Sequence, residues 1–256
     1  MDPAEIEIFL QEITDSYRVP IDFAVEKLEQ ACNEVLARIT GYEIETWVTR
    51  RESGTAIVIW AISGPWHDPV IRRLAPDKIS TNAAKWISSR IRALIREYSV
   101  LDHFGSLLRL HHRVFNGQIS KPPARGAPLI VDLTYTCAGN SVQTVTAVCP
   151  LRFQPPRERG SYALGQVHKF YVSKVRLAKK RRELGISIEL SRTSRKFPET
   201  LMKDLCREVL DSRRVIRCVR RVLGYRTEVV VSDPLPKEVL LAVRQEIGEY
   251  LQVTFI

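Results

Sequence analysis

The segment from Pro150 to Thr193 constrains the fold of this 256-residue chain more than any other. It opens with a proline-containing loop and a glycine turn, and continues as a long strand-like stretch, a short basic loop and a second strand-like stretch. Prolines and glycines mark turns, whereas alternating and β-branched residues favour strands. A two-stranded hairpin is only marginally stable alone, so this segment predicts the second half of a small β-barrel.

Three strands before this segment complete the predicted barrel. We expect the five strands at residues 113–121, 129–133, 144–151, 168–177 and 185–193. Five strands with a long loop between the third and the fourth are typical of an OB-type barrel. Such barrels bind single-stranded nucleic acid on the face of strands two and three, and through the loops that join strands one to two and four to five.

The predicted loops and strands carry side chains suited to nucleic acid, because basic groups contact phosphates and aromatic rings stack on bases. The alternative for the basic loop is a solubilising hairpin tip. The alternative for each aromatic is a place in the core, where aromatic side chains are common. We expect the basic loop to bind RNA. The candidate contacts in the barrel are the cations Lys121, Arg125, Lys179, Lys180, Arg181 and Arg182 and the aromatics Phe115, Phe153, Tyr162, Phe170 and Tyr171.

Charge is divided unequally along the chain. Residues 1–112 hold 13 Lys and Arg against 16 Asp and Glu, whereas residues 113–256 hold 26 against 13. The net charge of +10 therefore combines a balance of −3 in the first part with a balance of +13 in the second. This asymmetry favours a polyanion as the partner of the second part and a different partner for the first. The alternative, an evenly basic surface without functional meaning, would predict similar balances.

Residues 1–112 predict an N-terminal domain of helices and one hairpin. Helices are expected to begin at Asp2-Pro3 and near Pro20, the hairpin to cover residues 43–63, and a long helix to follow from about residue 80 to residue 103. This part contains no recognisable Ser/His/Asp set, paired-carboxylate pocket or phosphate-binding loop. We therefore expect a docking domain, and for the whole chain no enzymatic activity, no metal and no cofactor.

Residues 197–256 predict a module with the element order α-β-β-α-β. Its strands are expected at residues 213–221, 225–232 and 251–256, with one helix before the first strand and one before the last. Arginines are dense on the strand pair, and on alternate positions they would present a basic face able to contact phosphates. Arg217 and Arg221 are the candidate contacts there. A general charged sheet surface is the alternative.

Short motifs across the barrel resemble those of the NusA family of bacterial transcription elongation and termination factors. These motifs are Pro150-Leu151-Arg152, Pro156-Arg157-Glu158-Arg159, Tyr162-Ala163-Leu164-Gly165, Lys174-Val175-Arg176 and Leu190-Ser191-Arg192-Thr193. The helix from Asn82 to Arg92 is similar to the helix that leads into that family's barrel. The resemblance covers nearly the whole chain in order. It implies that residues 1–112 bind RNA polymerase near the RNA exit and that residues 113–196, an S-one type OB-fold domain, face the nascent single-stranded RNA.

The module at residues 197–256 resembles the first KH domain of the same family, on the run from Gly224 to Val229. A KH domain clamps RNA with a G-x-x-G loop between two helices. Gly248 is the only glycine between Asp233 and Ile256, so the clamp loop is missing and a degenerate type II KH-like module is expected. The expected fold class is thus α+β multidomain, with a helical and hairpin N-terminal domain, a five-stranded OB-type β-barrel and this module.

The first residues of the chain contain no basic region followed by a long apolar run, which argues against secretion and against a membrane span. The five cysteines are scattered and form no C-x-x-C pair. Reduced thiols in a cytoplasmic protein are therefore expected, with no membrane partner and a monomeric state when free. The alternative to a polymerase-bound factor is a polymerase-independent RNA-binding or ribosome-associated protein. An RNA-processing enzyme has little support.

Overall fold

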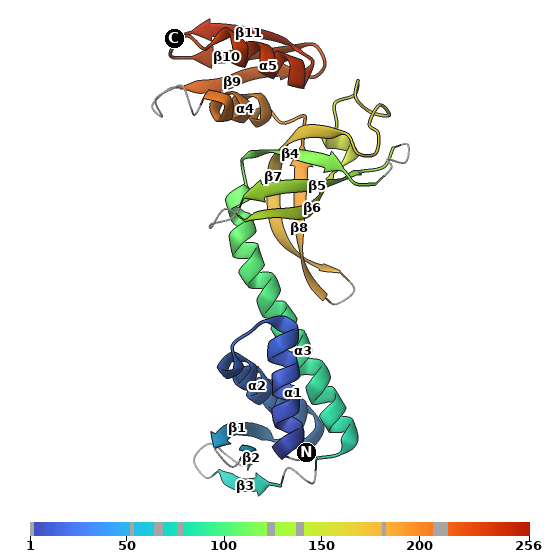
Figure 1. Ribbon diagram of the computed structural model, residues 1–256, viewed down its shortest axis with the longest axis vertical. Coiled ribbons are helices and arrows are strands. Elements are labelled where there is room, and N and C mark those ends of the chain that lie inside the picture. The colour runs from blue at the N-terminus through green and yellow to red at the C-terminus, as the bar shows by residue number, and fades with distance from the viewer. Residues whose placement is uncertain are drawn as a thin grey trace. The chain divides into compact units, whose positions relative to one another are not determined.

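The computed structural model describes residues 3–51, 54–63, 69–75, 79–121, 126–136, 141–180, 183–206 and 215–256. Within these ranges, no helix combines the length and the apolar composition needed to cross a membrane. The chain forms two compact units, Met1–Asp102 and His103–Ile256 (Figure 1). Leu107 and Leu110, at the start of the second unit, pack in the core of the barrel. The predicted division into three domains stays a prediction.

The first unit combines helices with a three-stranded antiparallel sheet. Its elements are α1 (Pro3–Tyr17), α2 (Ile21–Thr40), β1 (Glu43–Arg51), β2 (Gly54–Ser63), β3 (Val70–Leu74) and most of α3 (Thr81–Leu107), and the strand order is β1-β2-β3. α2 ends where Gly41 adopts a left-handed φ of +74°, a conformation that favours glycine. The predicted helices and hairpin are confirmed. The structure adds β3, an edge strand whose exposed Arg72 and Arg73 obscure the alternation that marks a strand.

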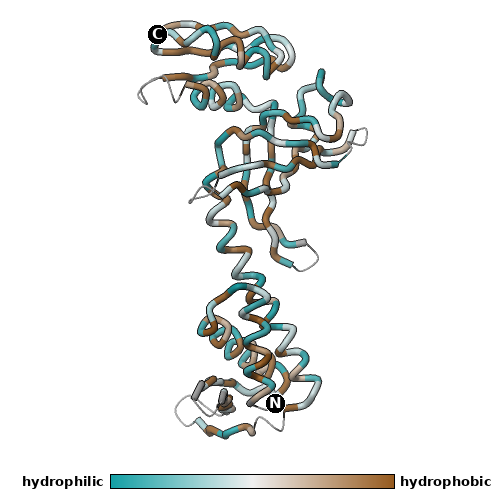
Figure 2. The backbone as a smooth tube through the Cα atoms, viewed as in Figure 1, coloured by the Kyte–Doolittle hydropathy of each residue, from teal (hydrophilic) through white to brown (hydrophobic). Residues whose placement is uncertain are grey.

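The second unit begins with a closed five-stranded barrel. β4 (Val114–Ile119), β5 (Leu129–Thr136), β6 (Val142–Cys149), β7 (Val167–Lys180) and β8 (Glu183–Ser191) pair in the order β4-β5-β6-β8-β7. Neighbouring strands are antiparallel except β6 and β8, which are parallel. Hydrophobic and hydrophilic residues alternate along the barrel strands (Figure 2), as expected where one face is buried. All five predicted strands are present, and the closed barrel is consistent with the OB type.

Gly117 on β4 lies where the barrel interior has no room for a side chain. A Cβ atom there would clash with Val131 Cγ1 and would lie 2.9 Å from both Leu133 Cδ2 and Phe170 Cδ2. Gly117→Ala should therefore lower the free energy of unfolding by about 1–3 kcal/mol, the usual cost of overpacking, as measured by urea denaturation. Gly105→Ala in α3 is the control, because a Cβ at Gly105 meets nothing within 4 Å. Equal losses in the two variants would contradict this description of the interior.

The C-terminal module, residues 196–256, follows the barrel in the same unit. α4 (Lys196–Cys206), β9 (Ile216–Val222), β10 (Arg226–Val231), α5 (Lys237–Ile247) and β11 (Tyr250–Phe255) confirm the predicted element order. The sheet order is β11-β10-β9, with β9 antiparallel and β11 parallel to β10. Phe197 and Leu201 of α4 and Val243 of α5 are buried in one core with Tyr171 of β7. The module therefore packs directly on the barrel.

The cysteines of the described residues are all free and buried: Cys32, Cys149, Cys206 and Cys218. Burial raises the pKa of the Cys32 and Cys149 thiols to about 12. These two thiols therefore stay protonated and unreactive at neutral pH. Cys137 lies outside the described residues.

Candidate nucleic-acid interface

The outer face of β5 and β6 offers little to a nucleic acid. Strand pairing places Asp132 opposite Thr146 and Thr134 opposite Thr144 on this face. The Thr146 hydroxyl donates a hydrogen bond to Asp132 Oδ1 at 2.8 Å. Within the described residues of the two strands, no Lys, Arg or aromatic side chain shares this face. The face of strands two and three therefore lacks the groups that bind phosphates and bases in OB-type barrels.

Three of the predicted aromatic contacts are buried. Phe170 lies in the barrel core and is 0% exposed, whereas Tyr171 lies in the core of the C-terminal module. Consecutive residues of a strand point to opposite faces, and both faces of β7 are covered here, one by the barrel interior and one by the module. The buried Tyr162 hydroxyl donates a hydrogen bond to Glu158. The prediction that these rings stack on bases is therefore corrected: they are core residues.

Phe115 and Phe153 are half-buried at the margin of the barrel core. The Arg152 guanidinium lies 4.7 Å from the centroid of the Phe153 ring, a cation–π contact. These two rings remain the aromatic candidates from the sequence.

Cations gather on the outer face of β7. Lys174 and Arg176 are exposed and lie opposite Glu189 and Ser187 of β8. Arg152 lies beside them, because its Nη2 is 3.2 Å from Glu189 Oε2 while the side chain is 67% exposed. We call Arg152, Lys174 and Arg176 the β7 strip. These three residues stand in the short motifs quoted from the sequence but were not predicted as RNA contacts, although the K-x-R spacing at Lys174 and Arg176 is the strand alternation that could have identified them.

β7 and β8 continue beyond the barrel as a two-stranded hairpin (Figure 1). Lys179 is exposed on this hairpin, opposite Leu184. Lys121 is exposed at the start of the β4–β5 loop. The remaining predicted cations, Arg125, Arg181, Arg182 and the side chain of Lys180, lie outside the described residues.

A β-bulge in the C-terminal sheet decides which arginines face solvent. The register of β9 against β10 shifts between Glu228 and Val229, so Arg217 lies opposite Val230 and Arg220 opposite Glu228. Both arginines are exposed. Strict alternation would place Arg217 and Arg221 on one face, but the bulge turns Arg221 to the inner face instead. Arg217 therefore remains a candidate contact and Arg220 joins it.

Arg221 is a buried structural cation, which corrects its prediction as an RNA contact. Its side chain is 1% exposed and its Nε lies 2.9 Å from Glu249 Oε2. Its Nη1 donates hydrogen bonds to the carbonyl oxygens of Arg192 and Ser194, both at 2.8 Å. A guanidinium enclosed by these partners cannot reach a phosphate. It holds the linker between the barrel and α4 instead.

Arg192 is a second buried cation, at the end of β8, and its side chain is 2% exposed. It donates to Glu158 Oε2 at 2.7 Å and Oε1 at 3.0 Å, to Glu246 Oε1 at 2.6 Å and to the carbonyl oxygen of Lys169 at 2.7 Å. Burial alone would lower the pKa of this guanidinium, but the Glu158 and Glu246 carboxylates raise it above its ordinary value. The charged side chain therefore ties the β6–β7 loop, β7 and α5 together.

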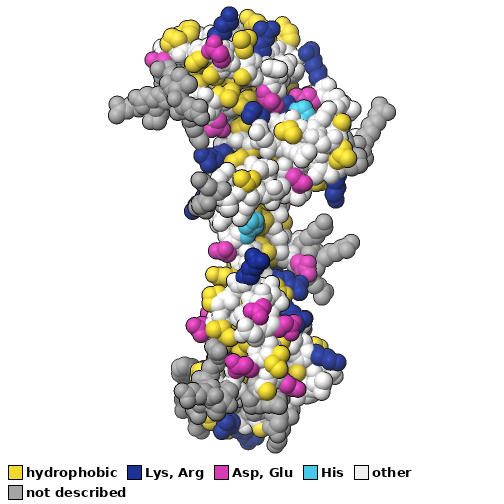
Figure 3. Space-filling model, viewed as in Figure 1, with side chains coloured by type: hydrophobic (Ala, Val, Ile, Leu, Met, Phe, Trp, Pro, Cys, Tyr) yellow, Lys and Arg dark blue, Asp and Glu magenta, His cyan; other side chains and the backbone are white. Residues whose placement is uncertain are grey.

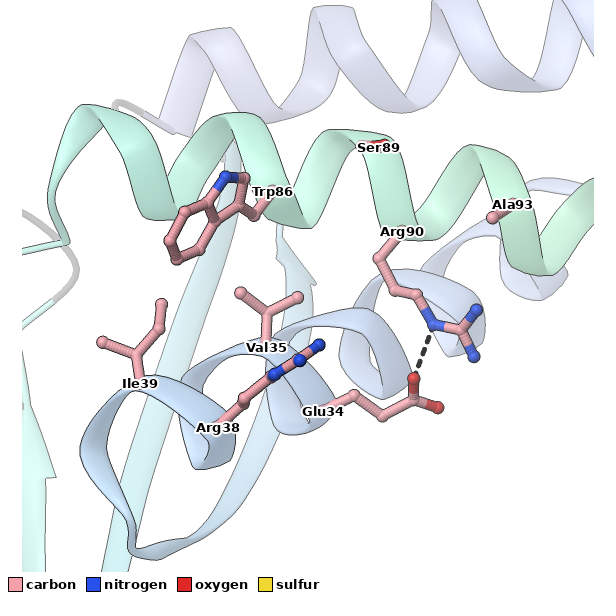
Figure 4. A pocket seen from close by; sticks show the side chains of 8 residues that line it. All are labelled: Glu34, Val35, Arg38, Ile39, Trp86, Ser89, Arg90 and Ala93. Carbon is pink, nitrogen blue, oxygen red and sulfur yellow. Dashed lines mark hydrogen bonds and ion pairs between the residues drawn. The ribbon is translucent and has the colours of Figure 1, made fainter. Parts of the chain in front are cut away.

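A groove of about 490 Å³ lies between α2 and α3 in the first unit. Trp86 of α3 faces Val35 and Ile39 of α2 (Figure 4), and Trp86 is 58% exposed. At the other end of the groove, Arg90 Nε lies 2.5 Å from Glu34 Oε2. The hydrogen bond from Arg90 lowers the pKa of Glu34. This arrangement is an apolar surface bordered by an ion pair.

Charged side chains of both signs lie on the visible face of each unit (Figure 3). In the second unit, some of the Lys and Arg side chains project from the margins of this surface (Figure 3). Arg192 and Arg221 do not belong to that surface, because both are buried. In the part of the chain that the structure describes, no three His, Cys, Asp or Glu side chains are placed to hold a metal ion.

No protein-family model matches this chain, and no curated protein matches it.

Proposed function

We propose that this chain is a NusA-like transcription factor that modulates pausing, termination or antitermination. Its second unit binds nascent single-stranded RNA and its first unit binds RNA polymerase. The observation that supports RNA binding is the exposed β7 strip of Arg152, Lys174 and Arg176 on a closed five-stranded barrel. Basic groups arranged along such a barrel track the backbone of a single strand. The KH-like C-terminal module adds Arg217 and Arg220 on its open sheet face.

The basic hairpin loop is tested by replacing Lys179, Lys180, Arg181 and Arg182 together with alanine. Affinity for a single strand of about 12 nucleotides, within the range that one OB-type barrel covers, should fall in anisotropy titrations. The logarithm of the binding constant should also fall with the logarithm of salt concentration, with a slope of about −0.7 for each phosphate neutralised. Unchanged affinity in the quadruple variant would mean that the loop does not contact RNA. The β7 strip would then supply the basic side chains of the site.

The groove between α2 and α3 is the candidate polymerase contact, because exposed tryptophan and isoleucine side chains form the kind of apolar surface that dominates interface energies. Trp86→Ala should weaken polymerase capture by the full chain by at least about 30-fold, the effect of losing an interface hot spot. Trp47→Ala is the control, because Trp47 is 49% exposed on β1 and does not line the groove. Loss of polymerase capture in Trp47→Ala alone would place the polymerase contact on the sheet of the first unit.

A polymerase-independent RNA-binding or ribosome-associated protein would use the same barrel and the same β7 strip. Sedimentation of cell extracts separates the two functions. Co-migration with polymerase supports the transcription factor, whereas a ribosome-bound fraction without polymerase favours the alternative.

A further inference from the structure

A groove of about 650 Å³ lies beside β9, the edge strand of the C-terminal sheet. The linker after the barrel contributes Arg195 and Lys196, and β9 contributes Arg217 and Val219. This volume falls within the range of about 300–1,000 Å³ that is usual for small-ligand pockets. The β7 strip and the basic hairpin loop contribute no residue to its described lining.

Cationic side chains outnumber carboxylate side chains in the described lining of this groove. Arg195, Lys196 and Arg217 share the described lining with a single carboxylate side chain, that of Glu199. Glu199 Oε1 is already paired with Lys196 Nζ at 3.2 Å and with Lys203 Nζ at 2.9 Å. Burial alone would raise the pKa of Glu199, but the hydrogen bonds from these two lysines lower it. Glu199 therefore stays ionised, and its charge is satisfied by lysines rather than by the two arginines.

The two arginines are free to bind an anion. The Arg217 guanidinium makes no hydrogen bond or ion pair with a described residue, and Arg195 makes one hydrogen bond, from Nη1 to the Val219 carbonyl oxygen at 3.4 Å. Guanidinium groups match the geometry of phosphate oxygens and can donate two parallel hydrogen bonds to them.

Apolar side chains form another part of the groove. Val219 is 50% exposed and Ile256 is 75% exposed, and Val230 of β10 lies half-buried beside them. A phosphate ion alone would leave this apolar surface in water. A ligand that carries both a phosphate and a flat, largely apolar ring would cover it, and a nucleotide has this chemistry.

The wall that carries Arg195 is held in place before any ligand binds. Arg221 Nη1 donates to the Ser194 carbonyl oxygen at 2.8 Å. The backbone amides of Thr193 and Ser194 donate to Ser191 Oγ at 3.2 Å and 3.0 Å. A preorganised wall reduces the entropy lost on binding, which gives the buried Arg221 a role in positioning the groove.

We propose that this groove binds one nucleotide of a single-stranded RNA. Arg195 and Arg217 bind its phosphate, and its base lies against Val219 and Ile256. The inference rests on the proposed RNA-binding function and adds to it a nucleotide site in a module that lacks a G-x-x-G clamp.

The test compares the full chain with its Arg195→Ala/Arg217→Ala double variant, using a fluorescently labelled single-stranded RNA at several salt concentrations. The dissociation constant should rise about tenfold, as expected for loss of charge-assisted hydrogen bonds. The slope against salt should become shallower by about 0.7, the value for one phosphate of a single strand. The Lys237→Ala/Arg244→Ala variant is the control, since it removes the same charge from exposed positions on α5 outside the groove.

A second measurement needs no variant. RNA containing 4-thiouridine should form a photo-crosslink with β9 of the wild-type chain. Equal effects of the two double variants, with no crosslink on β9, would overturn the nucleotide site while leaving RNA binding intact. A polyglutamate peptide that displaces the RNA as effectively as unlabelled RNA would overturn the assignment to a nucleotide. Absence of RNA binding by the wild-type chain would overturn the proposed function together with the groove.

Discussion

Arg192→Met should lower the free energy of unfolding of the second unit by about 3–5 kcal/mol, the usual cost of removing one partner from a buried ion pair. The side chain is 2% exposed, and the variant would leave the Glu158 and Glu246 carboxylates without the cation between them. Arg192→Lys should recover only part of the loss. A lysine keeps the charge, but it cannot reproduce the planar fork that reaches two carboxylates and a backbone carbonyl.

Arg92→Met is the matched control for Arg192→Met. Arg92 Nη2 lies 2.9 Å from Glu12 Oε1, but the two side chains are 41% and 58% exposed. An exposed pair contributes at most about 1 kcal/mol. Urea denaturation followed by circular dichroism measures both variants. If Arg192→Met costs no more than Arg92→Met, the buried pairs do not hold the barrel and the C-terminal module together.

Lys174→Ala/Arg176→Ala should weaken binding of single-stranded RNA by about 10–100-fold at low salt, as expected for the loss of two phosphate contacts. The slope of affinity against salt should become shallower by about 1.4, at about 0.7 for each phosphate. Both side chains are exposed on β7, so the variant should fold normally. Anisotropy titrations with one RNA at several salt concentrations give both quantities.

Thr134→Ala/Thr144→Ala tests whether RNA binds the outer face of β5 and β6 rather than the β7 strip. These threonines lie opposite each other on the outer face of β5 and β6, where OB-type barrels usually bind single strands. We expect affinity to stay within about twofold of the wild type, because this face lacks basic and aromatic side chains. A large loss in this variant and none in Lys174→Ala/Arg176→Ala would mean that the RNA follows β5 and β6.

Local patterns were sufficient to predict the elements of the barrel. The alternating residues of β5, and those from Lys174 to Arg176 in β7, carry the period of two that marks a strand, and loops with glycine and proline separate the strands. The run from Val70 to Leu74 was not predicted as β3, because an exposed edge strand with two arginines has no buried face to produce that period.

The direction of individual side chains could not be predicted, because it depends on bulges and on neighbouring layers. The bulge between Glu228 and Val229 exchanges the places of Arg220 and Arg221. Phe170 and Tyr171 are both buried because different cores cover the two faces of β7.

Ion pairs between residues far apart in the sequence could not be predicted either. Arg192 stands in the short motif Leu190-Ser191-Arg192-Thr193, but its partners Glu158 and Glu246 lie 34 and 54 residues away in the sequence. Closure of the barrel brings Glu158 of the β6–β7 loop to Arg192, and packing of the C-terminal module on the barrel brings Glu246 of α5.

The most direct test of the proposed function is pausing by RNA polymerase on a template with a defined pause site, in the presence of the full chain. The transcript carries 4-thiouridine just upstream of the pause. We predict a severalfold change in pause lifetime and a crosslink from the transcript to the second unit, with both lost in Trp86→Ala. An unchanged pause lifetime and no crosslink, with polymerase present and free RNA still bound by the chain, would contradict a polymerase-bound factor and favour the polymerase-independent alternative.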